Sequence, residues 1–362
     1  MKIKLKNTPE QVELVKAMGS RDVAVAREAS EAFAAFIGPV VSKVLMQAGT
    51  ASVIYSDAPY DEDDNPSLPL DLWFDQGQDY VTVWSQNVAG GLPSSAVEGF
   101  SELKVSTYRL DSAVSFLKRY ARRGRLDVVS KAVERMSNEV LVKQERNAWA
   151  VVLKALAEAR TPAVGTNNGV PGGHIATAQT AGTFQLSDLN KLMTLVKRIN
   201  TSYAGGTTTD AYGLTDLFVS PEIKAAIRAF AYQPFTTTGT AGTNLPDAVR
   251  EEIYRGAGTQ ELYGVTIHEL VELGVGAKYS ALYNAFKGQQ SFDSVTQEIA
   301  IGLDLSKEAF IRPIARQAES GGTFTVLPDD QFVARSEKTG FYGSLEEGRV
   351  CIDARAIVGL EV

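Results

Sequence analysis

Two histidines, one cysteine and one acidic run are the side chains of this sequence best suited to catalysis or metal binding. His174 lies in a Gly-, Thr- and Asn-rich stretch over residues 161–183, where we expect a solvated loop residue rather than a general base. His268 opens the run His-Glu-Leu-Val-Glu, which is similar to the zinc-protease motif H-E-x-x-H. Glu replaces the second His, and the surroundings indicate a strand rather than a helix. We therefore predict no metal site there.

The acidic run Asp61-Glu62-Asp63-Asp64-Asn65 mimics the start of a calcium-binding loop, which needs oxygen ligands at positions 1, 3 and 5. Pro66 stands where that loop needs Gly, and Leu72 stands where it needs a bidentate Glu. We therefore expect a solvated acidic loop, with incidental or intersubunit cation binding as the alternative.

Cys351 is the single cysteine, and its apolar, strand-like surroundings predict a buried packing role. One cysteine excludes a disulfide or a cysteine-based zinc site within one chain. The glycine-rich signatures of nucleotide binding and the G-x-S-x-G nucleophile elbow are absent from the sequence. We therefore expect a protein that is not an enzyme, with no catalytic residues, no metal site and no cofactor.

The chain has 362 residues, which is enough to bury a large core. Apolar residues make up 44% and charged residues 22%, which excludes disordered, collagen-like and disulfide-scaffold classes. No apolar run reaches the roughly 18 residues needed to span a bilayer. The basic N-terminus is not followed by an apolar core, so we expect no secretory signal, synthesis in the cytoplasm and no membrane partner.

Charge is distributed unevenly along the chain, although the net charge is only −7. Between Lys43 and Lys104 there are ten acidic residues and no Lys or Arg, a net of −10. Residues 104–125 then carry a net of +6, with Asp111 as their only acidic residue. Blocks of opposite sign predict two surfaces that meet, within a chain or between chains. The arginines could also contact nucleic acid, but the acidic overall balance favours protein contact.

Two segments show helical periodicity. Residues 8–47 begin with a Thr cap and Pro9, and we expect Gly38-Pro39 to interrupt the helix. Residues 126–158 carry apolar side chains mostly three and four apart without Gly or Pro, which predicts a helix roughly 50 Å long. Arg146 and Asn147 break any clean heptad pattern, so one helix crossing a flat domain fits better than a coiled coil.

Residues 53–109 lose helical character, because prolines and a Gly90-Gly91 pair recur there. Residues 80–84 and 103–108 are strand-like, rich in β-branched and aromatic side chains. The pattern predicts a small β-subdomain or a long two-stranded excursion. Because an isolated hairpin is marginal in water, the excursion would need a partner to lie on.

The remaining sequence predicts a mixed α/β region followed by a strand-rich end. Helices are expected at 186–200 and 221–231, and strands at 217–220, 265–267, 280–283 and 298–301. The strand-rich end has candidate strands at 324–327, 332–334 and 349–352.

Three segments, together with the order of the predicted elements, carry a resemblance to a known family. They are residues 108–116 (YRLDSAVSF), 143–149 (KQERNAW) and 217–222 (LFVSPE). The chain resembles the major capsid protein of tailed bacteriophages, the Hong Kong 97-type fold, over essentially its whole length. The resemblance implies an α+β fold with an N-terminal arm, an extended β-hairpin loop, a long spine helix, and peripheral and axial domains.

In that family's terms, the chain divides into five segments. They are an N-terminal arm (1–52), an extended loop or E-loop (53–109), a peripheral domain (110–201) with its spine helix at about 126–158, an axial domain (202–312), and a return to the peripheral domain (313–362).

The resemblance also implies a function and a set of partners. Copies of the chain would assemble through hexamers and pentamers into an icosahedral shell, made in the host cytoplasm, that becomes the virion capsid. The shell would enclose double-stranded DNA without sequence-specific binding. A portal is implied, and a decoration protein is left open. Many members carry a long N-terminal scaffolding domain, whereas this chain begins at a short arm, so a separate scaffolding protein is expected.

We expect the acidic loop of one subunit to contact the basic segment of its neighbour. Exposed ion pairs contribute only about 0–1 kcal/mol each, so apolar side chains of the loop must supply most of the adhesion. The acidic and apolar members are Asp61, Glu62, Asp63, Asp64, Asp71, Trp73, Phe74 and Asp75, with Leu70 and Leu72. The basic members are Lys118, Arg119, Arg122, Arg123 and Arg125.

Two other functions remain open from the sequence. An encapsulin-like compartment has the same fold but encloses cargo enzymes. An α/β enzyme with an unrecognised site is the alternative from a different class, although two histidines, one cysteine and no convergent motif argue against it.

Overall fold

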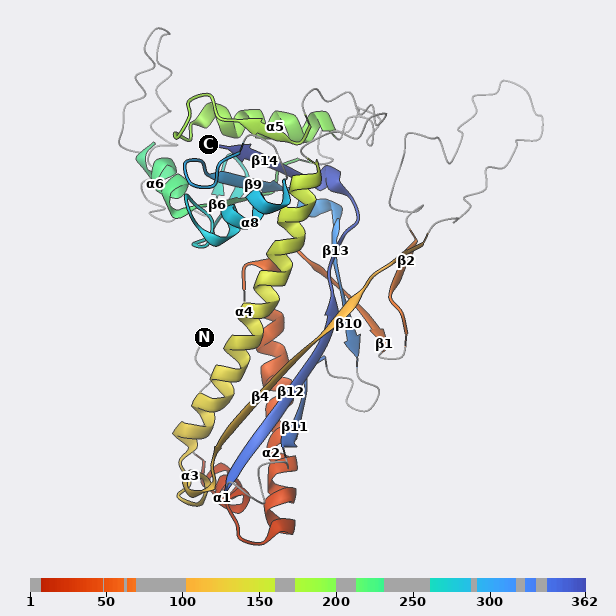
Figure 1. Ribbon diagram of the computed structural model, residues 1–362, viewed down its shortest axis with the longest axis vertical. Helices are drawn as coiled ribbons and strands as arrows, with labels where there is room; N and C mark the ends of the chain where they lie inside the picture. Colours follow the sequence, from red (N-terminus) through yellow and green to blue (C-terminus); the bar gives the residue numbers. More distant parts are fainter. Residues whose placement is uncertain are drawn as a thin grey trace, which may run out of the picture. The chain divides into compact units, whose positions relative to one another are not determined.

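The computed structural model describes residues 8–47, 49–61, 64–69, 102–159, 173–199, 213–230, 261–287, 292–316, 323–329 and 337–362. The chain forms two compact units, each assembled from separate segments (Figure 1). The first comprises Met1–Leu68, Lys104–Ala148 and Ile311–Val350, and the second comprises Pro69–Leu103, Trp149–Phe310 and Cys351–Val362. Helices and sheets occur in both units, which confirms the α+β class.

Among the described residues, no helix combines the length and the apolar character that a membrane span requires.

The helical stretch predicted over residues 8–47 is present as two helices, α1 (Pro9–Met18) and α2 (Val23–Gln47). They are separated by a turn that begins at Gly19. A Cβ atom at Gly19 would stand only 2.6 Å from the backbone nitrogen of Arg122, so this close approach requires glycine.

Our prediction that Gly38-Pro39 interrupts the second helix is wrong, because α2 continues through Pro39. A proline inside a helix leaves the carbonyl four residues earlier, here that of Ala35, without its usual donor. Ala35 and Pro39 are both exposed, so water can satisfy that carbonyl.

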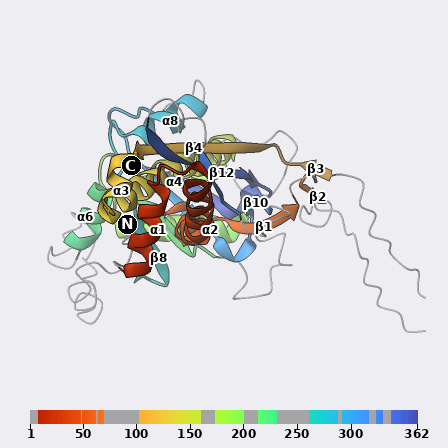
Figure 2. The same cartoon turned by 90° about the horizontal axis from the view of Figure 1, so that it is seen from below.

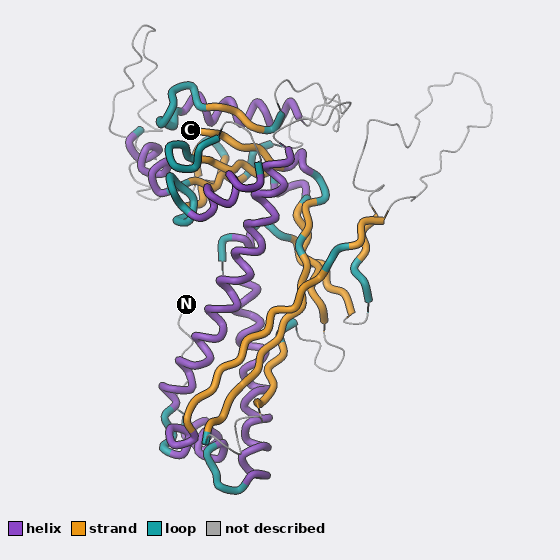
Figure 3. The backbone as a smooth tube through the Cα atoms, viewed as in Figure 1, coloured by secondary structure: helices purple, strands orange, loops and turns teal. Residues whose placement is uncertain are grey.

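Two long antiparallel strands, β4 (Thr107–Leu117) and β12 (Lys338–Gly348), belong to a six-stranded sheet in the first unit, with β12 in its centre and β4 along one edge (Figure 3). They pair over their full length, from Leu117 opposite Lys338 to Thr107 opposite Gly348. The opposite edge of β12 pairs with two further strands, β11 and β10, and β10 pairs in parallel with β1. The other strands of this sheet are β1 (Ser56–Asp61), β10 (Phe310–Arg316), β11 (Thr325–Asp329) and β13 (Val350–Cys351).

One face of this sheet is buried beneath helices. Along β4, Leu110 and Phe116 are buried whereas Arg109 and Asp111 are exposed, the alternation of a strand with one solvated face. Helices α1 and α2 lie together on one side of β4 (Figure 2). The shared core contains side chains of α1, α2, the N-terminal part of α4, and the sheet.

Strand β12 was not predicted from the sequence. It contains Gly340, Gly343 and Gly348, and glycine is depleted in strands, so its pattern does not indicate one. The structure explains one of them: a Cβ atom at Gly343 would lie 2.5 Å from the ring of Phe324. The predicted strand at 324–327 overlaps β11, which begins at Thr325, and the one at 332–334 lies outside the described residues.

The long helix predicted at 126–158 is present as α4 (Leu126–Ala159). Its 34 residues span about 51 Å at 1.5 Å per residue. In the first unit, buried side chains recur at three- and four-residue spacing along one face, from Leu126 through Val129, Val133 and Met136 to Val140. The three- and four-residue spacing of apolar residues in the sequence therefore corresponds to a stripe of buried side chains on the helix.

The second unit contains its own six-stranded sheet, in the order β5-β14-β9-β6-β8-β7. The strands are β5 (Ile175–Thr177), β6 (Asp216–Val219), β7 (Glu261–Leu262), β8 (Val265–Glu269), β9 (Ile299–Leu303) and β14 (Ile357–Glu361). The helices are α5 (Leu186–Ile199), α6 (Pro221–Ala229) and α8 (Lys278–Phe286). Trp149 of α4 is fully buried in this unit, 5.0 Å from the ring of Phe218.

Most elements predicted for this region are confirmed, but the strand predicted at 280–283 is wrong, because those residues lie in α8. Its sequence Ser-Ala-Leu-Tyr has no period long enough to separate a strand from a short helix.

The predicted excursion is described at its base. A two-stranded sheet pairs β2 (Ser67–Pro69) with β3 (Glu102–Lys104). The single strand predicted at 103–108 is divided between β3 and β4, and the strand predicted at 80–84 lies outside the described residues. Three-residue strands are far below the length of a stable isolated hairpin.

We predict that Phe341→Ala lowers the free energy of unfolding of the unassembled subunit by about 3–5 kcal/mol. Phe341 of β12 is 1% exposed and packs between Phe33 of α2 and Phe116 of β4, with ring-centroid distances of 5.4 and 6.2 Å. Urea denaturation measures the loss. Leu327→Ala, on the neighbouring strand β11 but 52% exposed, is the control and should change stability by about 0.5 kcal/mol or less. Equal losses in the two variants would contradict this packing.

Candidate intersubunit surface

The basic residues predicted to contact a neighbour lie on α3 (Lys118–Arg122) and on the turn that leads into α4. Helix α3 begins directly after β4 and has only five residues. A short helix exposes its side chains in several directions, so neighbouring basic residues need not share one surface. The structure divides them into a pair that contacts other segments of the subunit and a group that lies at the surface without such contacts.

Lys118 and Arg122 are the pair with such contacts, although the side chain of Arg122 is also exposed. The side chain of Lys118 is buried, and its backbone N–H donates to the carbonyl of Glu337 at 2.8 Å. The Nε of Arg122 donates to the carbonyl of Gly19 at 2.7 Å, which joins α3 to the turn between α1 and α2. Arg122 therefore has a structural role within its own subunit, which the sequence analysis did not predict.

Arg119, Arg123 and Arg125 are exposed and form what we call the basic edge. The guanidinium of Arg119 donates to the hydroxyl of Tyr120 at 3.2 Å and lies 5.0 Å from the centroid of that ring. Arg125 forms a long, exposed ion pair with Asp127, 3.9 Å between the closest atoms. Such contacts in water are weak, so these guanidinium groups can exchange them for an acidic partner.

Of the acidic and aromatic residues predicted to face this surface, Asp61 and Asp64 are described. Both are exposed, and the N–H of Asp64 donates to the carbonyl of Asp61 at 2.9 Å. The other predicted contact residues lie outside the described residues: Glu62, Asp63, Leu70, Asp71, Leu72, Trp73, Phe74 and Asp75. Among the described residues, no group of three or more His, Cys, Asp or Glu side chains is placed to hold a metal ion.

Helix α2 contributes an apolar surface that the sequence analysis did not predict. Phe33, Ile37 and Val41 are buried in the core, whereas Phe36 and Val40 on the same helix are 48% and 41% exposed. The sequence does contain a signal for this exposed surface, because apolar residues occupy more than one face of the helix.

A buried carboxylate, Glu347 of β12, was also missed. Glu347 is fully buried and accepts hydrogen bonds from the Tyr108 hydroxyl at 2.8 Å and from Gln144 Nε2 at 3.0 Å. Arg349 donates to it at 3.3 Å, and an Arg312 nitrogen lies 3.9 Å away. We call these five residues the Glu347 cluster. They come from β12, β4, α4, β10 and the segment just after β12.

A second set of bonds extends the cluster to β1. The guanidinium of Arg312 donates two hydrogen bonds to Asp57, at 2.6 and 2.7 Å, in the bidentate geometry that Arg and carboxylates favour. The guanidinium of Arg349 lies 4.7 Å from the centroid of the Tyr55 ring. Every charge in the cluster therefore has a specific partner, which is the condition for burying charge in a protein.

Glu346, next in sequence, holds both ends of the excursion. Its Oε1 accepts a hydrogen bond from the Tyr60 hydroxyl at 3.0 Å and another from the Thr107 hydroxyl at 2.8 Å. Tyr60 lies near the end of β1, where the chain leaves the sheet, and Thr107 begins β4, where it returns. One carboxylate thereby joins the two ends of the excursion.

The two histidines have structural contacts. His174 is partly buried rather than solvated as predicted, its Nδ1 is 3.0 Å from the carbonyl oxygen of Ile357, and burial lowers its pKa. His268 lies on β8, as the sequence indicated, with its Nε2 2.7 Å from Asp216 and its ring stacked on Phe218.

Cys351 is half-buried, and burial raises the pKa of its thiol to about 12. A thiol that stays protonated at neutral pH is a poor nucleophile, which agrees with the packing role predicted for this residue.

Comparison with known proteins identifies the fold. No family model and no curated protein matches the chain. Among solved structures, the capsid of a native GTA particle is matched with a TM-score of 0.51 and 14% identity, covering 87% of this chain and 90% of that one. The mature capsid of bacteriophage PhiM1 is matched with a TM-score of 0.46 and 12% identity, covering 87% of each chain. An encapsulin from Synechococcus elongatus gives 0.41 and 11%, covering 72% and 76%.

The match to the GTA capsid covers nearly all of both chains, so the similarity concerns the whole architecture. The chain therefore has the fold of capsid shell subunits, and the Hong Kong 97-type fold expected from the sequence is confirmed.

We predict that wild-type stability falls between pH 10 and about 12 through Tyr108. Burial, reinforced by the nearby Glu347 carboxylate, raises the pKa of Tyr108 to about 12 in the folded chain. The unfolded chain releases this proton near pH 10, so over that interval only the folded state retains it and unfolding becomes more favourable.

The test compares urea denaturation of the wild type and Tyr108→Phe at pH 9 and pH 11.5. At pH 9 the wild type should have the larger free energy of unfolding. At pH 11.5 its difference from the variant should be smaller. Tyr263→Phe, at a 48% exposed position, serves as the control. If the difference in free energy of unfolding between the wild type and Tyr108→Phe stayed constant with pH, it would contradict the raised pKa of Tyr108.

Proposed function

We propose that this chain is a major capsid protein, which assembles with copies of itself into an icosahedral shell around packaged double-stranded DNA. The observation that carries the proposal is the capsid-type fold, which covers 87% of the chain in the match to the native GTA capsid. A shell subunit needs surfaces for several neighbours and no active site, and the described surfaces fit that requirement.

Exposed apolar side chains in both units support contacts with neighbours. Phe36 and Val40 lie on α2 in the first unit, and Val271, Val275 and Val295 are 51–75% exposed in the second. These side chains expose apolar area to water. Burying that area against another copy would stabilise the contact by about 25 cal/mol per Å².

The charge distribution supports one particular contact. The basic edge of Arg119, Arg123 and Arg125 is exposed, and the acidic stretch between Lys43 and Lys104 contains no Lys or Arg of its own. Residues 56–61 and 107–109 belong to the subunit's own sheet, so we propose that the remainder of the excursion, residues 70–101, lies on the basic edge of a neighbour. Apolar residues of the excursion supply adhesion, and the charges set register and specificity.

Assembly of the purified full-length chain tests the proposed function. We expect negative-stain microscopy and light scattering to show hexamers, pentamers or closed shells, alone or with a separate scaffolding protein. Shells from infected host cells should contain DNA, with the corresponding excess of absorbance at 260 nm. A chain that remains monomeric at high concentration in both settings would contradict a capsid function, and shells filled with protein cargo would favour a compartment.

We predict that reversing the basic edge raises the concentration needed for assembly about tenfold. Three exposed ion pairs at about 0.5 kcal/mol each amount to about 1.5 kcal/mol per contact. The variant is Arg119→Glu, Arg123→Glu, Arg125→Glu, assayed by light scattering at low and high salt, and the effect should shrink at high salt.

The matched control reverses three exposed cations of α4: Lys131→Glu, Arg135→Glu, Lys143→Glu. This control changes net charge by the same amount at a different surface. If both variants shift the threshold equally, net charge rather than the basic edge governs assembly.

A further inference from the structure

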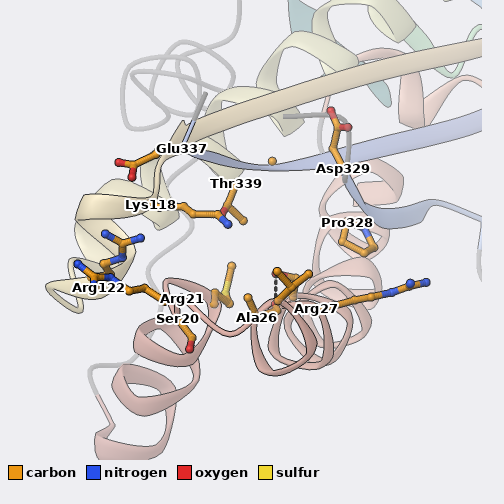
Figure 4. Close-up of a pocket in the computed structure, with 14 residues that line it drawn as sticks. Ser20, Arg21, Ala26, Arg27, Lys118, Arg122, Pro328, Asp329, Glu337 and Thr339 are labelled. Atoms are coloured by element: carbon orange, nitrogen blue, oxygen red, sulfur yellow. Dashed lines mark hydrogen bonds between the residues drawn. The ribbon is translucent and has the colours of Figure 1, made fainter. Parts of the chain in front are cut away.

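A pocket of about 710 Å³ lies within the first unit, where the turn between α1 and α2 meets α3, the end of β11 and the start of β12 (Figure 4). This volume is in the range of pockets that bind small organic ligands. Part of the wall is apolar and is formed by Met18, Val23, Ala26 and Pro328. The rest carries charged and hydroxyl side chains, so the pocket suits a ligand that has both an organic part and a charged group.

Thr339 of β12 contributes a buried hydroxyl group to this pocket. The residue is 4% exposed, and among the described residues its hydroxyl oxygen has no hydrogen-bond partner. Burying a hydroxyl without a hydrogen bond is unfavourable, because the group loses its bonds to water and gains none in return. The backbone of Thr339 is paired with Phe116 of β4, so the sheet holds the residue at this position. A ligand that bonds to the hydroxyl would remove the cost of burying it.

Cationic side chains outnumber carboxylates in the lining of the pocket. The cations are Arg21, Arg27, Lys118 and Arg122, and the carboxylates are Asp329 and Glu337. Arg27 also forms an exposed ion pair with Glu31 at 2.9 Å, which leaves three cations against the two carboxylates. The remaining positive charge favours an anionic ligand.

The side chains around the buried hydroxyl are arranged to donate hydrogen bonds. In Figure 4 the side chain of Lys118 extends toward Thr339, whereas the carboxylates of Asp329 and Glu337 point away from these two residues. Arg122 uses its Nε for the carbonyl of Gly19, and its guanidinium group has further N–H donors. An ammonium, a guanidinium and a hydroxyl therefore line one pocket, which suits an anion with several acceptor oxygens.

We propose that this pocket binds the phosphate group of a phosphate ester. Lys118, Arg122 and Thr339 donate to the phosphate oxygens, and the organic part of the ester contacts Met18 and Pro328. A phosphate presents more acceptor oxygens than a carboxylate, so it uses the three kinds of donor more fully.

Two sources have this chemistry, namely a free nucleotide and the backbone of the DNA that the proposed shell encloses. The second source rests on the proposed function, whereas the binding chemistry of the pocket does not.

Isothermal titration calorimetry of the unassembled full-length subunit tests the site, with deoxyadenosine monophosphate (dAMP) as the probe. We expect a Kd of about 1 mM or lower, from several hydrogen bonds to one charged group. Deoxyadenosine lacks the phosphate, and acetate offers a carboxylate at the same ionic strength, so both should bind about tenfold more weakly or worse. If deoxyadenosine or acetate binds as tightly as dAMP, the assignment of a phosphate site is wrong.

Thr339→Val separates a specific site from the general attraction of anions to a basic surface. The substitution keeps the shape and the net charge and removes only the hydroxyl, so binding of dAMP should weaken about tenfold. The free subunit should be at least as stable as the wild type in urea denaturation, because the variant loses an unpartnered buried hydroxyl. Unchanged affinity would overturn the proposal. A loss of stability would contradict it too, because the hydroxyl would then be bonded within the subunit.

Lys118→Met tests the ammonium, with Lys143→Met at an exposed position of α4 as the matched control. Both substitutions lower the net charge by one. We expect Lys118→Met to weaken binding of dAMP about tenfold or more, and Lys143→Met to leave it unchanged. Equal weakening in the two variants would mean that net charge, and not the pocket, attracts the ligand.

Fluorescence anisotropy with a short labelled DNA duplex distinguishes the two sources of phosphate. A duplex that binds the wild type more tightly than Thr339→Val would identify the DNA backbone as a ligand of the pocket. If only binding of dAMP depends on Thr339, a free nucleotide is the ligand. If neither depends on Thr339, the inference is overturned. Shell assembly is not measured in these experiments, so their failure would leave the proposed capsid function standing.

Discussion

The burial of the Glu347 carboxylate is the interaction on which the first unit depends. A carboxylate removed from water costs several kcal/mol unless hydrogen bonds and opposite charge replace its hydration. Its replacements come from Tyr108, Gln144, Arg349 and Arg312, each on a different segment of the chain. β4, β10, β12 and α4 must therefore assemble together, because omitting any one would leave a buried charge without part of its compensation.

A neighbouring carboxylate holds both ends of the chain segment that runs from β1 to β4. Glu346 binds Tyr60 and Thr107, so the point where the chain leaves the sheet and the point where it returns are bonded to the same carboxylate. The segment between β1 and β4 therefore starts and ends at fixed positions on the subunit's own sheet. The described strands β2 and β3 have three residues each, too few to be stable by themselves.

The sequence predicted the features that depend on local pattern and missed those that depend on distant partners. Helix α4 and the buried stripe along it follow from spacing alone. The prediction that Gly38-Pro39 interrupts the helix was wrong because a helix tolerates proline where the backbone is exposed to water, and the sequence does not show that exposure. β12 was missed because its glycines are explained by residues far away in sequence, such as Phe324. Among the predicted contact residues, Lys118 is buried and Arg122 is bonded to Gly19 within its own subunit. A basic run does not reveal which side chains are buried or bonded within their own subunit.

The central claim is that the chain is a shell subunit whose excursion lies on its neighbour from a base fixed by Glu346 and the Glu347 cluster. Electron cryo-microscopy of particles formed by the full-length chain tests it most directly. The account predicts a closed shell in which the chain between Pro69 and Glu102 runs over an adjacent copy while Glu347 stays buried in each subunit. Particles in which that segment packs on its own subunit, or a chain that forms no particle, would contradict it.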